Sequence, residues 1–341
     1  MTAGIVVGGI VLLLALVASL IWALGSRAKA RLAARYPAPG QMVDVGGYRL
    51  HLNCQGTPVA GRPTVVLEAA HSESGLSWAS VQPEVAKFTR VCSYDRAGLG
   101  WSEPSPKPRT ADTIVDELHT LLARAGIEPP YVLVGHSIGG MSVRLYAHEH
   151  PDEGAGMVLV DPTHEEQSAR MPEAIAKMQA TSTKAAGCVF GLFRAMSSIG
   201  LLAPLASMKG GVWPMPIPRE ARAAYLATLY SGAQYFEAAT RETLAMPESL
   251  ALVRARQIKS LGDFPLTVIS AGKPAISAGH GISEADAERM KAVAEELHVE
   301  IAALSPRGKR VIAEGSGHYV QVERPALVVD AIREVVEAAR G

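Results

Sequence analysis

The segment Tyr131–Gly140, with the sequence YVLVGHSIGG, constrains the fold more than any other part of the chain. It begins with an apolar run without alternation, which is typical of a strand buried on both faces. Glycines then allow a close backbone approach, and Met141–His150 contains good helix formers and ends before a proline. Ser137 is therefore predicted to lie at a strand–turn–helix corner, where its side chain must project. The alternative is a tight turn whose serine only caps the helix.

Predicted strands and helices alternate around this corner. A hairpin is expected at Met42–Cys54, turning at Gly46-Gly47. Further strands are expected at Thr64–Glu68, Arg90–Tyr94 and Gly156–Val160, and helices at Ala79–Phe88 and Thr110–Ala125. Such alternation predicts an α/β fold with a mostly parallel, doubly wound sheet that has helices on both faces.

A long interruption follows the strand that ends at Val160. Residues 162–264 show no further strand pattern, whereas a connection in such a sheet is usually about two to six residues long. Helical patterns recur there at Pro218–Leu229 and Ala233–Ala245, so we expect a helical lid inserted in the sheet. The core is then expected at 41–161 and 265–341. Its second part should contain strands at Pro265–Ser270 and Arg310–Ala313, and helices at Ser283–Leu297 and Pro325–Ala339.

The N-terminal segment Ala3–Gly25 contains no charged residue. As a helix it is long enough to cross a hydrocarbon core of about 30 Å, so residues 1–26 are predicted to be a transmembrane anchor. Residues 27–40 form a predicted basic linker that contains Arg27, Lys29, Arg31 and Arg35. Positive charge on this side favours a following domain on the cytoplasmic face of a membrane. The alternative is a signal peptide cleaved after Ala23-Leu24-Gly25, which would make that domain secreted or periplasmic.

Composition excludes several classes of function. The 33 basic and 33 acidic residues cancel to a formal net charge of zero, so no basic field indicates a nucleic-acid partner. Neither a P-loop nor a glycine-rich dinucleotide fingerprint is present, and no cofactor is expected. Cys54, Cys92 and Cys188 lack metal-ligand spacing. We therefore expect no metal and interpret the cysteines as small buried hydrophobic residues. The sequence does not indicate an oligomeric state.

A serine hydroxyl becomes a good nucleophile when an imidazole accepts its proton and a carboxylate orients that imidazole. In doubly wound sheets such groups meet at the carboxyl ends of the strands. His318 follows the last predicted strand in a glycine-flanked loop at this edge, so it is the expected base for Ser137. His280 is the alternative, because its loop also follows a strand.

Three short motifs occur along the chain, and their order supports a family resemblance. DRAGLGWSEP comes first, GHSIG at 135–139 follows, and GSGHYV lies near the C-terminus. GHSIG fits the G-x-S-x-G nucleophile elbow in its strand–turn–helix context. From Met42 to Gly341 the chain therefore resembles the α/β-hydrolase fold family. The resemblance implies a serine acyl-transfer mechanism that needs neither metal nor cofactor.

The resemblance also implies an oxyanion hole made by two backbone N–H groups. One belongs to Ile138, the residue after the nucleophile. The other comes from the loop after the third strand, where the family often has His-Gly-x. Ala69-Ala70-His71 occupies that place here, without the glycine, so the second donor is expected to be the His71 amide. Each such donor typically contributes a factor of about a hundred to a thousand to the rate.

The position of the expected catalytic acid along the chain differs from the commoner pattern of the family. The family usually supplies it after the strand that follows the lid, but this chain has Lys273 there and no carboxylate before Glu284. Asp161 ends the strand after the elbow helix, in the position that some lipases and dehalogenases of this fold use, so it is the expected acid. Glu165, Glu284 and Asp286 remain alternatives, and a turn cap is the non-catalytic alternative for Asp161.

The expected function is that of a membrane-anchored carboxylesterase or lipase-like enzyme acting on a small apolar ester. A serine at the elbow argues against the dehalogenase and epoxide-hydrolase branches, because membership of those branches would require a carboxylate nucleophile. A carbon–carbon bond hydrolase or an acyltransferase would use the same three residues. A non-catalytic, lid-gated binding protein is an alternative from a different class.

Overall fold

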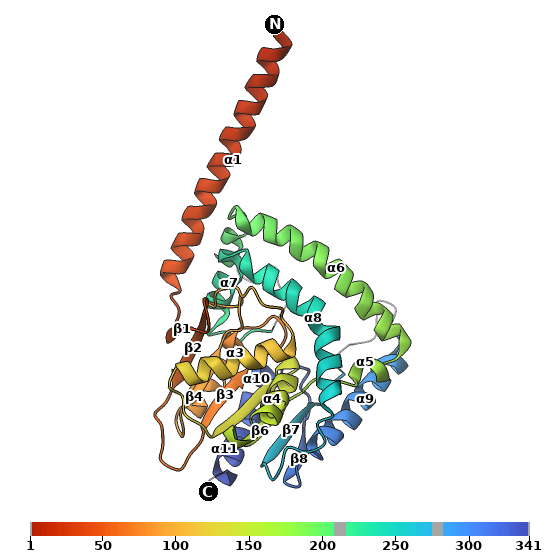
Figure 1. The fold of residues 1–341 in the computed structure, drawn as a ribbon. Coiled ribbons are helices and arrows are strands. Elements are labelled where there is room, and N and C mark those ends of the chain that lie inside the picture. Colours follow the sequence, from red (N-terminus) through yellow and green to blue (C-terminus); the bar gives the residue numbers. More distant parts are fainter. Residues whose placement is uncertain (1, 208–215, 275–281, 340–341) are drawn as a thin grey trace.

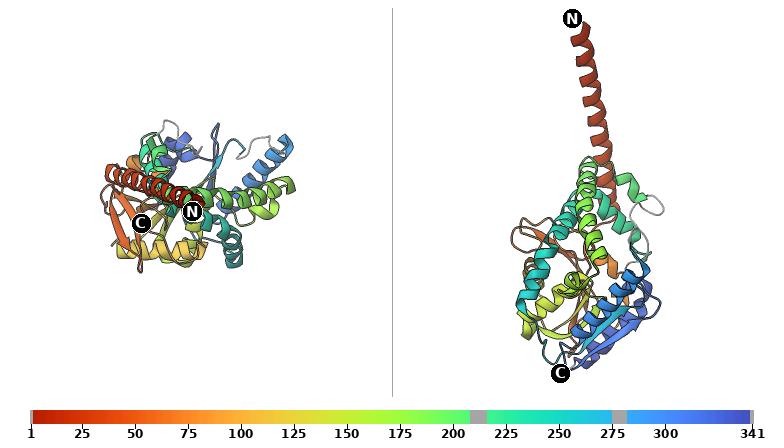
Figure 2. Two further views of the ribbon diagram at one scale, coloured as in Figure 1. Left: turned by 90° about the horizontal axis from the view of Figure 1, so that it is seen from above. Right: turned by 90° about the vertical axis from the view of Figure 1, so that its right-hand side faces the viewer.

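The computed structural model describes residues 2–207, 216–274 and 282–339 (Figure 1). A central sheet is flanked by helices, further helices lie over one side of it, and a long N-terminal helix projects from the body (Figures 1 and 2). The predicted α/β fold with a mostly parallel sheet is confirmed.

The described strands form one sheet in the order β1-β2-β4-β3-β5-β6-β7-β8. Their bounds are β1 Gln41–Asp44, β2 Arg49–Gln55, β3 Thr64–Glu68, β4 Val91–Tyr94, β5 Tyr131–His136, β6 Gly154–Val160, β7 Leu266–Ala271 and β8 Gly308–Ala313. Strand β2 is antiparallel to both of its neighbours, and all pairs from β4 to β8 are parallel. The carboxyl ends of the parallel strands therefore share one edge, where side chains from distant segments can meet.

The central strands are buried on both faces, as their apolar sequences predict. Leu133 of β5 belongs to the hydrophobic cluster under α3 and α4, and Val132 and Val134 belong to the cluster under α11 on the other face. The helices of the core are α2 Gln82–Val85, α3 Ala111–Arg124, α4 Ile138–Glu149, α9 Glu284–Ala302, α10 Val320–Glu323 and α11 Pro325–Ala338, with 3-10 turns η1 Gly75–Trp78 and η2 Pro151–Glu153.

One predicted helix differs from the structure. Instead of a helix over Ala79–Phe88, the chain forms the turn η1 and then α2, which is only four residues long. Pro83 lies in the first turn of α2. Because proline has no N–H to continue a helix that starts earlier, the helix begins again at this point.

The helices between β6 and β7 form the lid. They are α5 Gln167–Arg170, α6 Glu173–Ser198, η3 Ala203–Ser207, α7 Arg222–Ser231 and α8 Gln234–Arg256. The first part of α8 contributes Phe236 to a hydrophobic cluster of the lid, and its last part contributes Leu250 and Val253 to the core of the sheet. Pro247 lies between these parts, where the missing N–H allows α8 to bend (Figure 1).

The N-terminal helix α1 covers Thr2–Arg35 and is, by length and composition, a candidate membrane span. Its apolar part is exposed and projects away from the body (Figure 2). The helix continues through most of the segment predicted as a basic linker. Only Tyr36–Gly40 connects it to β1 as irregular chain.

The interpretation of the cysteines as small buried hydrophobic residues is wrong, because two of them form a disulfide bond and the third is exposed. Cys54 of β2 lies directly opposite Cys92 of β4, and a disulfide bond joins them. Cys188, on α6, is a free and exposed cysteine. The pair was missed because β2 and β4 are not consecutive along the chain, and the register between them is a tertiary feature.

Candidate active site

Ser137 lies between the last residue of β5 and the first residue of α4. Its φ of 55° is one that residues other than glycine rarely adopt. Two glycines allow this sharp turn. A Cβ atom on Gly135 would lie 2.5 Å from the backbone of Gly139, and a Cβ atom on Gly139 would lie 2.6 Å from the Ala69 carbonyl oxygen. The glycines therefore let α4 start close to the ends of β5 and β3.

Asp161 follows β6 and His318 follows β8, and the fold brings their side chains together. The Nδ1 atom of His318 lies 2.5 Å from Oδ2 of Asp161, and the Ala271 N–H donates to the other carboxylate oxygen at 2.9 Å. The N–H of Ser137 donates to the carbonyl oxygen of Val160 at 3.1 Å. The corner that presents Ser137 is therefore joined to the strand end that presents Asp161.

Backbone conformation distinguishes this edge of the sheet. Among the described residues, Ser72, Ser137, Asp161 and Gln257 are the non-glycine residues with positive φ. The first three lie in loops at the carboxyl ends of β3, β5 and β6. Such conformations cost free energy and concentrate at functional sites.

The second ring nitrogen of His318, Nε2, makes no hydrogen bond within the described part of the chain, and the side chain is 29% exposed. Ser137 Oγ is not bonded to it in this state. Hydrogen bonds of this kind often tighten only when a substrate is bound. An imidazole held at Nδ1 and open at Nε2 can accept a proton on Nε2.

The two side chains shift each other's pKa in opposite directions. Burial by itself lowers the pKa of His318, but the hydrogen bond and charge of Asp161 outweigh burial and raise it above its ordinary value. Burial by itself raises the pKa of Asp161, and the hydrogen bond and charge of His318 outweigh burial and lower it. The pair therefore favours an ionised aspartate that stabilises a protonated histidine.

His136, directly before the nucleophile, supports the loop of His318. Its Nε2 lies 2.9 Å from the His318 carbonyl oxygen, and its Nδ1 lies 2.9 Å from the amide nitrogen of Gln321. Glu73 is buried with its nearer oxygen 3.7 Å from His136 Nδ1, and that oxygen has no hydrogen-bond partner. Sequence reasoning missed both residues. The position of His136 next to Ser137 was an available signal, whereas nothing in the local pattern distinguishes Glu73.

The two expected oxyanion donors line one cavity of about 340 Å³. Ile138 is the first residue of α4, so its N–H has no acceptor within the helix. His71 lies in the loop after β3, and its side-chain Nε2 is 3.0 Å from the hydroxyl of Thr243 on α8. The cavity lies between these residues and the lid. Its other lining residues are Thr163, Gln167, Ser168, Met171, Gln179, Ser182, Thr183, Thr243, Met246 and Leu250.

A buried arginine supports the loop that carries His71. Arg96, from the DRAGLGWSEP motif, donates to two carbonyl oxygens of this loop and to the carboxylates of Glu68 and Glu242. Glu242 belongs to α8 and accepts the N–H of Ser72 at 3.0 Å. Burial would raise the pKa of Glu242, but Arg96 outweighs burial and the pKa falls to about 2. An ionised pair therefore ties the loop to the lid, a contact that no local sequence pattern indicated.

The described alternatives to Asp161 occupy other positions in the fold. Glu165 forms an ion pair with Arg144 at 2.8 Å, and Glu284 and Asp286 lie in the first turn of α9. His280 lies outside the described residues.

Within the described ranges, one cluster has three side chains that could ligate a metal: His119, His150 and Glu153. The two imidazole rings are stacked, 4.1 Å apart and inclined by 4°. The lone pairs of parallel rings do not converge on one ion. Glu153 also bonds to His119 and accepts the hydroxyl of Tyr146. The arrangement is that of a hydrogen-bonded stack away from Ser137.

A model of the alpha/beta hydrolase family matches residues 60–331. A protein of Gibberella zeae, described as an AB hydrolase superfamily protein, is 26% identical over 308 residues, which cover 86% of this chain and 92% of that protein. The chain spans less than half the length of the first curated relatives that it matches.

Two solved structures illustrate the similarity in fold. A thermophilic esterase from Thermogutta terrifontis has a TM-score of 0.57 at 22% identity, over 88% of this chain and 99% of the esterase. An epoxide hydrolase variant from Vigna radiata has a TM-score of 0.62 at 19% identity, over 87% of this chain and 98% of the hydrolase. At these identities the likeness concerns the fold alone.

Proposed function

Because the chain belongs to the alpha/beta hydrolase family, we propose that it is a serine hydrolase that cleaves a carboxylic ester through an acyl-enzyme. The observation that carries the proposal is the bond between His318 Nδ1 and Asp161. It lies at the sheet edge where Ser137 projects from a strained corner. His71 and Ile138, the proposed oxyanion donors, both line the cavity of about 340 Å³.

In the proposed reaction, Ser137 Oγ attacks the ester carbonyl carbon while His318 Nε2 accepts the hydroxyl proton. Asp161 holds the opposite nitrogen and stabilises the imidazolium. The N–H groups of His71 and Ile138 stabilise the oxyanion of the tetrahedral intermediate. His318 then donates the proton to the leaving alcohol. Water attacks the acyl–serine, again with His318 as the base, and releases the carboxylic acid.

The serine also favours an ester over an epoxide as the substrate. A carboxylate nucleophile that opens an epoxide forms an ester, which water can hydrolyse. Ser137 in the same reaction would form an ether, which water does not cleave under these conditions. We therefore take the similarity to epoxide hydrolases as evidence for the fold and not for the reaction. Carbon–carbon bond hydrolysis and acyl transfer use the same groups and are the second candidate.

The cavity lining narrows the substrate class. A volume of about 340 Å³ is at the small end for ligand sites. Four apolar side chains line it, Ile138, Met171, Met246 and Leu250, beside a larger number of hydroxyl, amide and imidazole groups. We therefore propose an ester that carries hydrogen-bonding groups near the scissile bond. This refines the wholly apolar ester expected from the sequence.

A fluorophosphonate probe tests the proposal directly, because it reacts only with an activated serine. The wild-type protein should be labelled at a single site, and Ser137→Ala should abolish labelling. The variant Ser142→Ala, in the helix α4 that follows Ser137, is the matched control and should be labelled like the wild type. Labelling that survives in Ser137→Ala, or none in the folded wild type, would contradict the proposal and favour the non-catalytic binding protein.

The side of the membrane is a separate proposal. The basic residues after α1 favour the cytoplasmic face. The Cys54–Cys92 disulfide favours an oxidising compartment, because thiols stay reduced in most cytoplasms. A covalent bond within the domain is more specific than a charge asymmetry, so we propose that the domain lies on the oxidising side. Alkylation of the protein from cells lysed in the presence of a thiol reagent should modify Cys188 alone. Modification of all three cysteines would contradict this proposal and indicate that the domain lies in the cytoplasm.

A further inference from the structure

The tip of the lid packs directly against the candidate membrane-spanning helix. A Cβ atom on Gly25 of α1 would lie 2.2 Å from the carbonyl oxygen of Ile199, and one on Gly200 would lie 2.3 Å from the Gly25 Cα atom. Gly200 also has a φ of 78°. The close approach of the two backbones at this point therefore requires glycine on both sides.

A second contact lies one turn further along α1. The ammonium group of Lys29 is 3.4 Å and 3.3 Å from the carbonyl oxygens of Ser197 and Ser198, the last residues of α6. The carbonyl groups at a helix C-terminus lack partners within the helix and carry partial negative charge, so a lysine there is favourable. The end of the lid helix α6 is therefore joined to α1 by backbone packing and by a charged cap.

The same region marks the level at which α1 would leave a bilayer. Trp22 is 59% exposed at the end of the apolar segment, and tryptophan concentrates at membrane–water interfaces. Gly25 follows about 5 Å further along the helix, before the basic residues Arg27 and Lys29. The tip of the lid thus contacts α1 at the depth of the interface.

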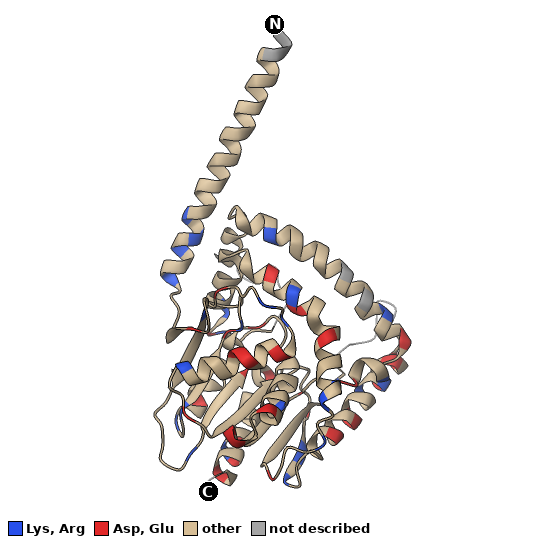
Figure 3. Ribbon diagram, in the orientation of Figure 1, with Lys and Arg blue, Asp and Glu red and all other residues tan. Residues whose placement is uncertain are grey.

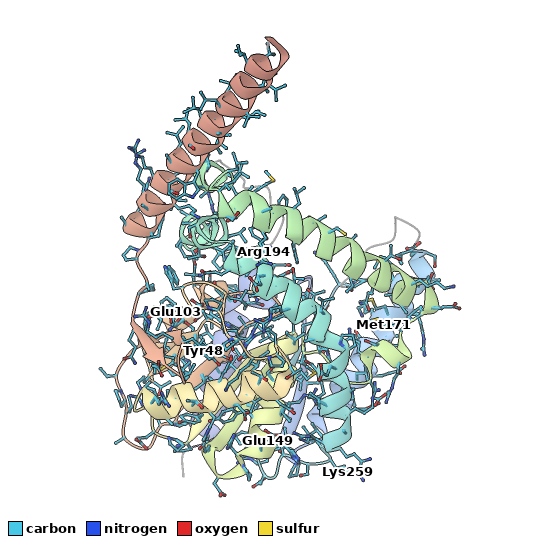
Figure 4. All side chains as sticks on the ribbon, turned by 45° about the horizontal axis from the view of Figure 1, so that its top comes forward. Tyr48, Glu103, Glu149, Met171, Arg194 and Lys259 are labelled. Carbon is cyan, nitrogen blue, oxygen red and sulfur yellow. A yellow bond between two sulfur atoms is a disulfide. The ribbon has the colours of Figure 1, made fainter. Side chains whose placement is uncertain are left out.

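The exposed edge of α6 beside this contact is apolar. We call the residues Cys188–Leu201 the lid edge. Its exposed large side chains are Val189, Leu192, Ile199 and Leu201, with exposed fractions of 44%, 61%, 39% and 44%. The single charged residue of this stretch is Arg194, which is labelled in Figure 4, and Figure 3 shows this part of α6 as otherwise free of charged residues. Arg194 forms an ion pair with Glu237 of α8 at 3.1 Å. The opposite end of α6 carries Glu173 and Lys177 on its surface.

We propose that the lid edge docks on the lipid bilayer that α1 spans. The exposed Ile199 and Leu201 flank Gly200, which packs against Gly25 at the end of the apolar part of α1, so a bilayer around α1 lies next to this end of the lid edge. A second copy of the chain could cover an apolar edge, but it would not account for the packing of the edge at the interface depth of α1.

Docking has a consequence for the active site. Helix α6 is 26 residues long, or about 39 Å, and its other end supplies Gln179, Ser182 and Thr183 to the cavity lining. Because one helix connects the membrane contact with the cavity, the position of the bilayer and that of the lid are coupled.

The free cysteine offers a direct test that needs no catalysis. Full-length protein is labelled at Cys188 with an environment-sensitive fluorophore and reconstituted in phosphatidylcholine vesicles that contain phosphatidylglycerol. If the lid edge lies in the bilayer, doxyl-labelled lipid should quench the emission at least threefold, and aqueous iodide should have little effect. This result should not change when the protein is diluted tenfold in lipid.

Two matched double variants complete the experiment. Val189→Glu with Leu192→Glu should transfer the quenching from lipid to iodide. Val299→Glu with Leu244→Glu makes the same changes at sites of similar exposure outside the lid edge, and should behave like the parent. Strong iodide quenching in the parent would overturn the proposal. Protection that disappears on dilution in lipid would overturn it in favour of a second copy. Because fluorescence reports position and not turnover, neither outcome depends on the proposed hydrolase activity.

Discussion

Two histidine–aspartate pairs in this molecule share a geometry and differ in the partner of the second ring nitrogen. His318 Nδ1 bonds to Asp161 at 2.5 Å, and His51 Nδ1 bonds to Asp95 at 2.8 Å. In both pairs burial lowers the histidine pKa, and the aspartate outweighs burial and raises it. The Nε2 atom of His51 also bonds to the carbonyl oxygen of Pro39, whereas that of His318 has no such partner among the described residues.

The second nitrogen decides what each pair can do. Asp95 and the Pro39 carbonyl are both acceptors, so His51 donates from both nitrogens as the doubly protonated, positively charged imidazolium. It holds the chain after α1 on the edge of the sheet. His51 lines a cavity of about 390 Å³, yet its side chain is only 4% exposed, against 29% for His318. The His51–Asp95 pair therefore has a structural role, whereas in the His318–Asp161 pair the histidine is a candidate catalytic base.

The largest expected effect on activity comes from removing His318, the histidine whose Nε2 atom has no hydrogen-bond partner among the described residues. His318→Ala should lower kcat by about a thousandfold or more with little change in stability, because it removes the base from a loop outside the core. His51→Ala is the matched control, and its activity per folded molecule should stay within about threefold of the wild type. Ester hydrolysis, normalised to folded protein by circular dichroism, measures both. The reverse ranking would assign the catalytic role to His51.

Asp161→Asn should lower kcat by about a thousandfold while the protein still folds. Because the Ala271 N–H requires the amide oxygen as its acceptor, the amide NH2 group faces His318 Nδ1 and holds the imidazole in the tautomer that cannot accept the Ser137 proton. Glu284→Gln is the control, since it removes an exposed carboxylate from α9, and should remain within about tenfold of the wild type. Near-normal activity of Asp161→Asn would show that another acid orients His318.

For the His51–Asp95 pair, the expected effect is on the stability of the fold. His51→Ala leaves a buried Asp95 carboxylate without its charged partner, which should cost about 3 kcal/mol in the free energy of unfolding. Because the His51 pKa is raised in the folded state, the stabilisation is fully present below the ordinary value of 6.5 and is lost as the pH rises through the raised pKa. Urea unfolding at pH 6 and pH 9 should therefore show a smaller difference between variant and wild type at pH 9.

The smallest effect is a displacement of the pH profile. The base must be neutral, and Asp161 raises the His318 pKa, so kcat/KM should fall on the acid side with a midpoint above pH 6.5. In the residual activity of Asp161→Asn this midpoint should move to lower pH. His51→Ala should leave it unchanged. A midpoint that moves with His51 and not with Asp161 would contradict the assignment of the two pairs.

The two pairs also show how far sequence reasoning reaches. His318 was singled out because it follows a strand at the carboxyl edge, which is a statement about position in a predicted topology. His51 lies within the first hairpin, away from that edge, so its position along the chain gives no such signal. Asp161, 157 residues from His318, could be expected as its partner only through the family resemblance, and no pattern indicates that Asp95, 44 residues from His51, pairs with that histidine.

Local patterns by themselves determined the strand–turn–helix corner at Ser137, the alternation of strands and helices, the lid insertion and the apolar helix α1. Each depends on residues that are near one another along the chain, where propensity, periodicity and glycine placement act. The tertiary structure alone decided the Cys54–Cys92 bond, the tie between Arg96 and Glu242, and the contact of α1 with the lid. These depend on which strands become neighbours and how closely helices pack. Burial and register set such contacts, and neither is encoded in any short segment of sequence.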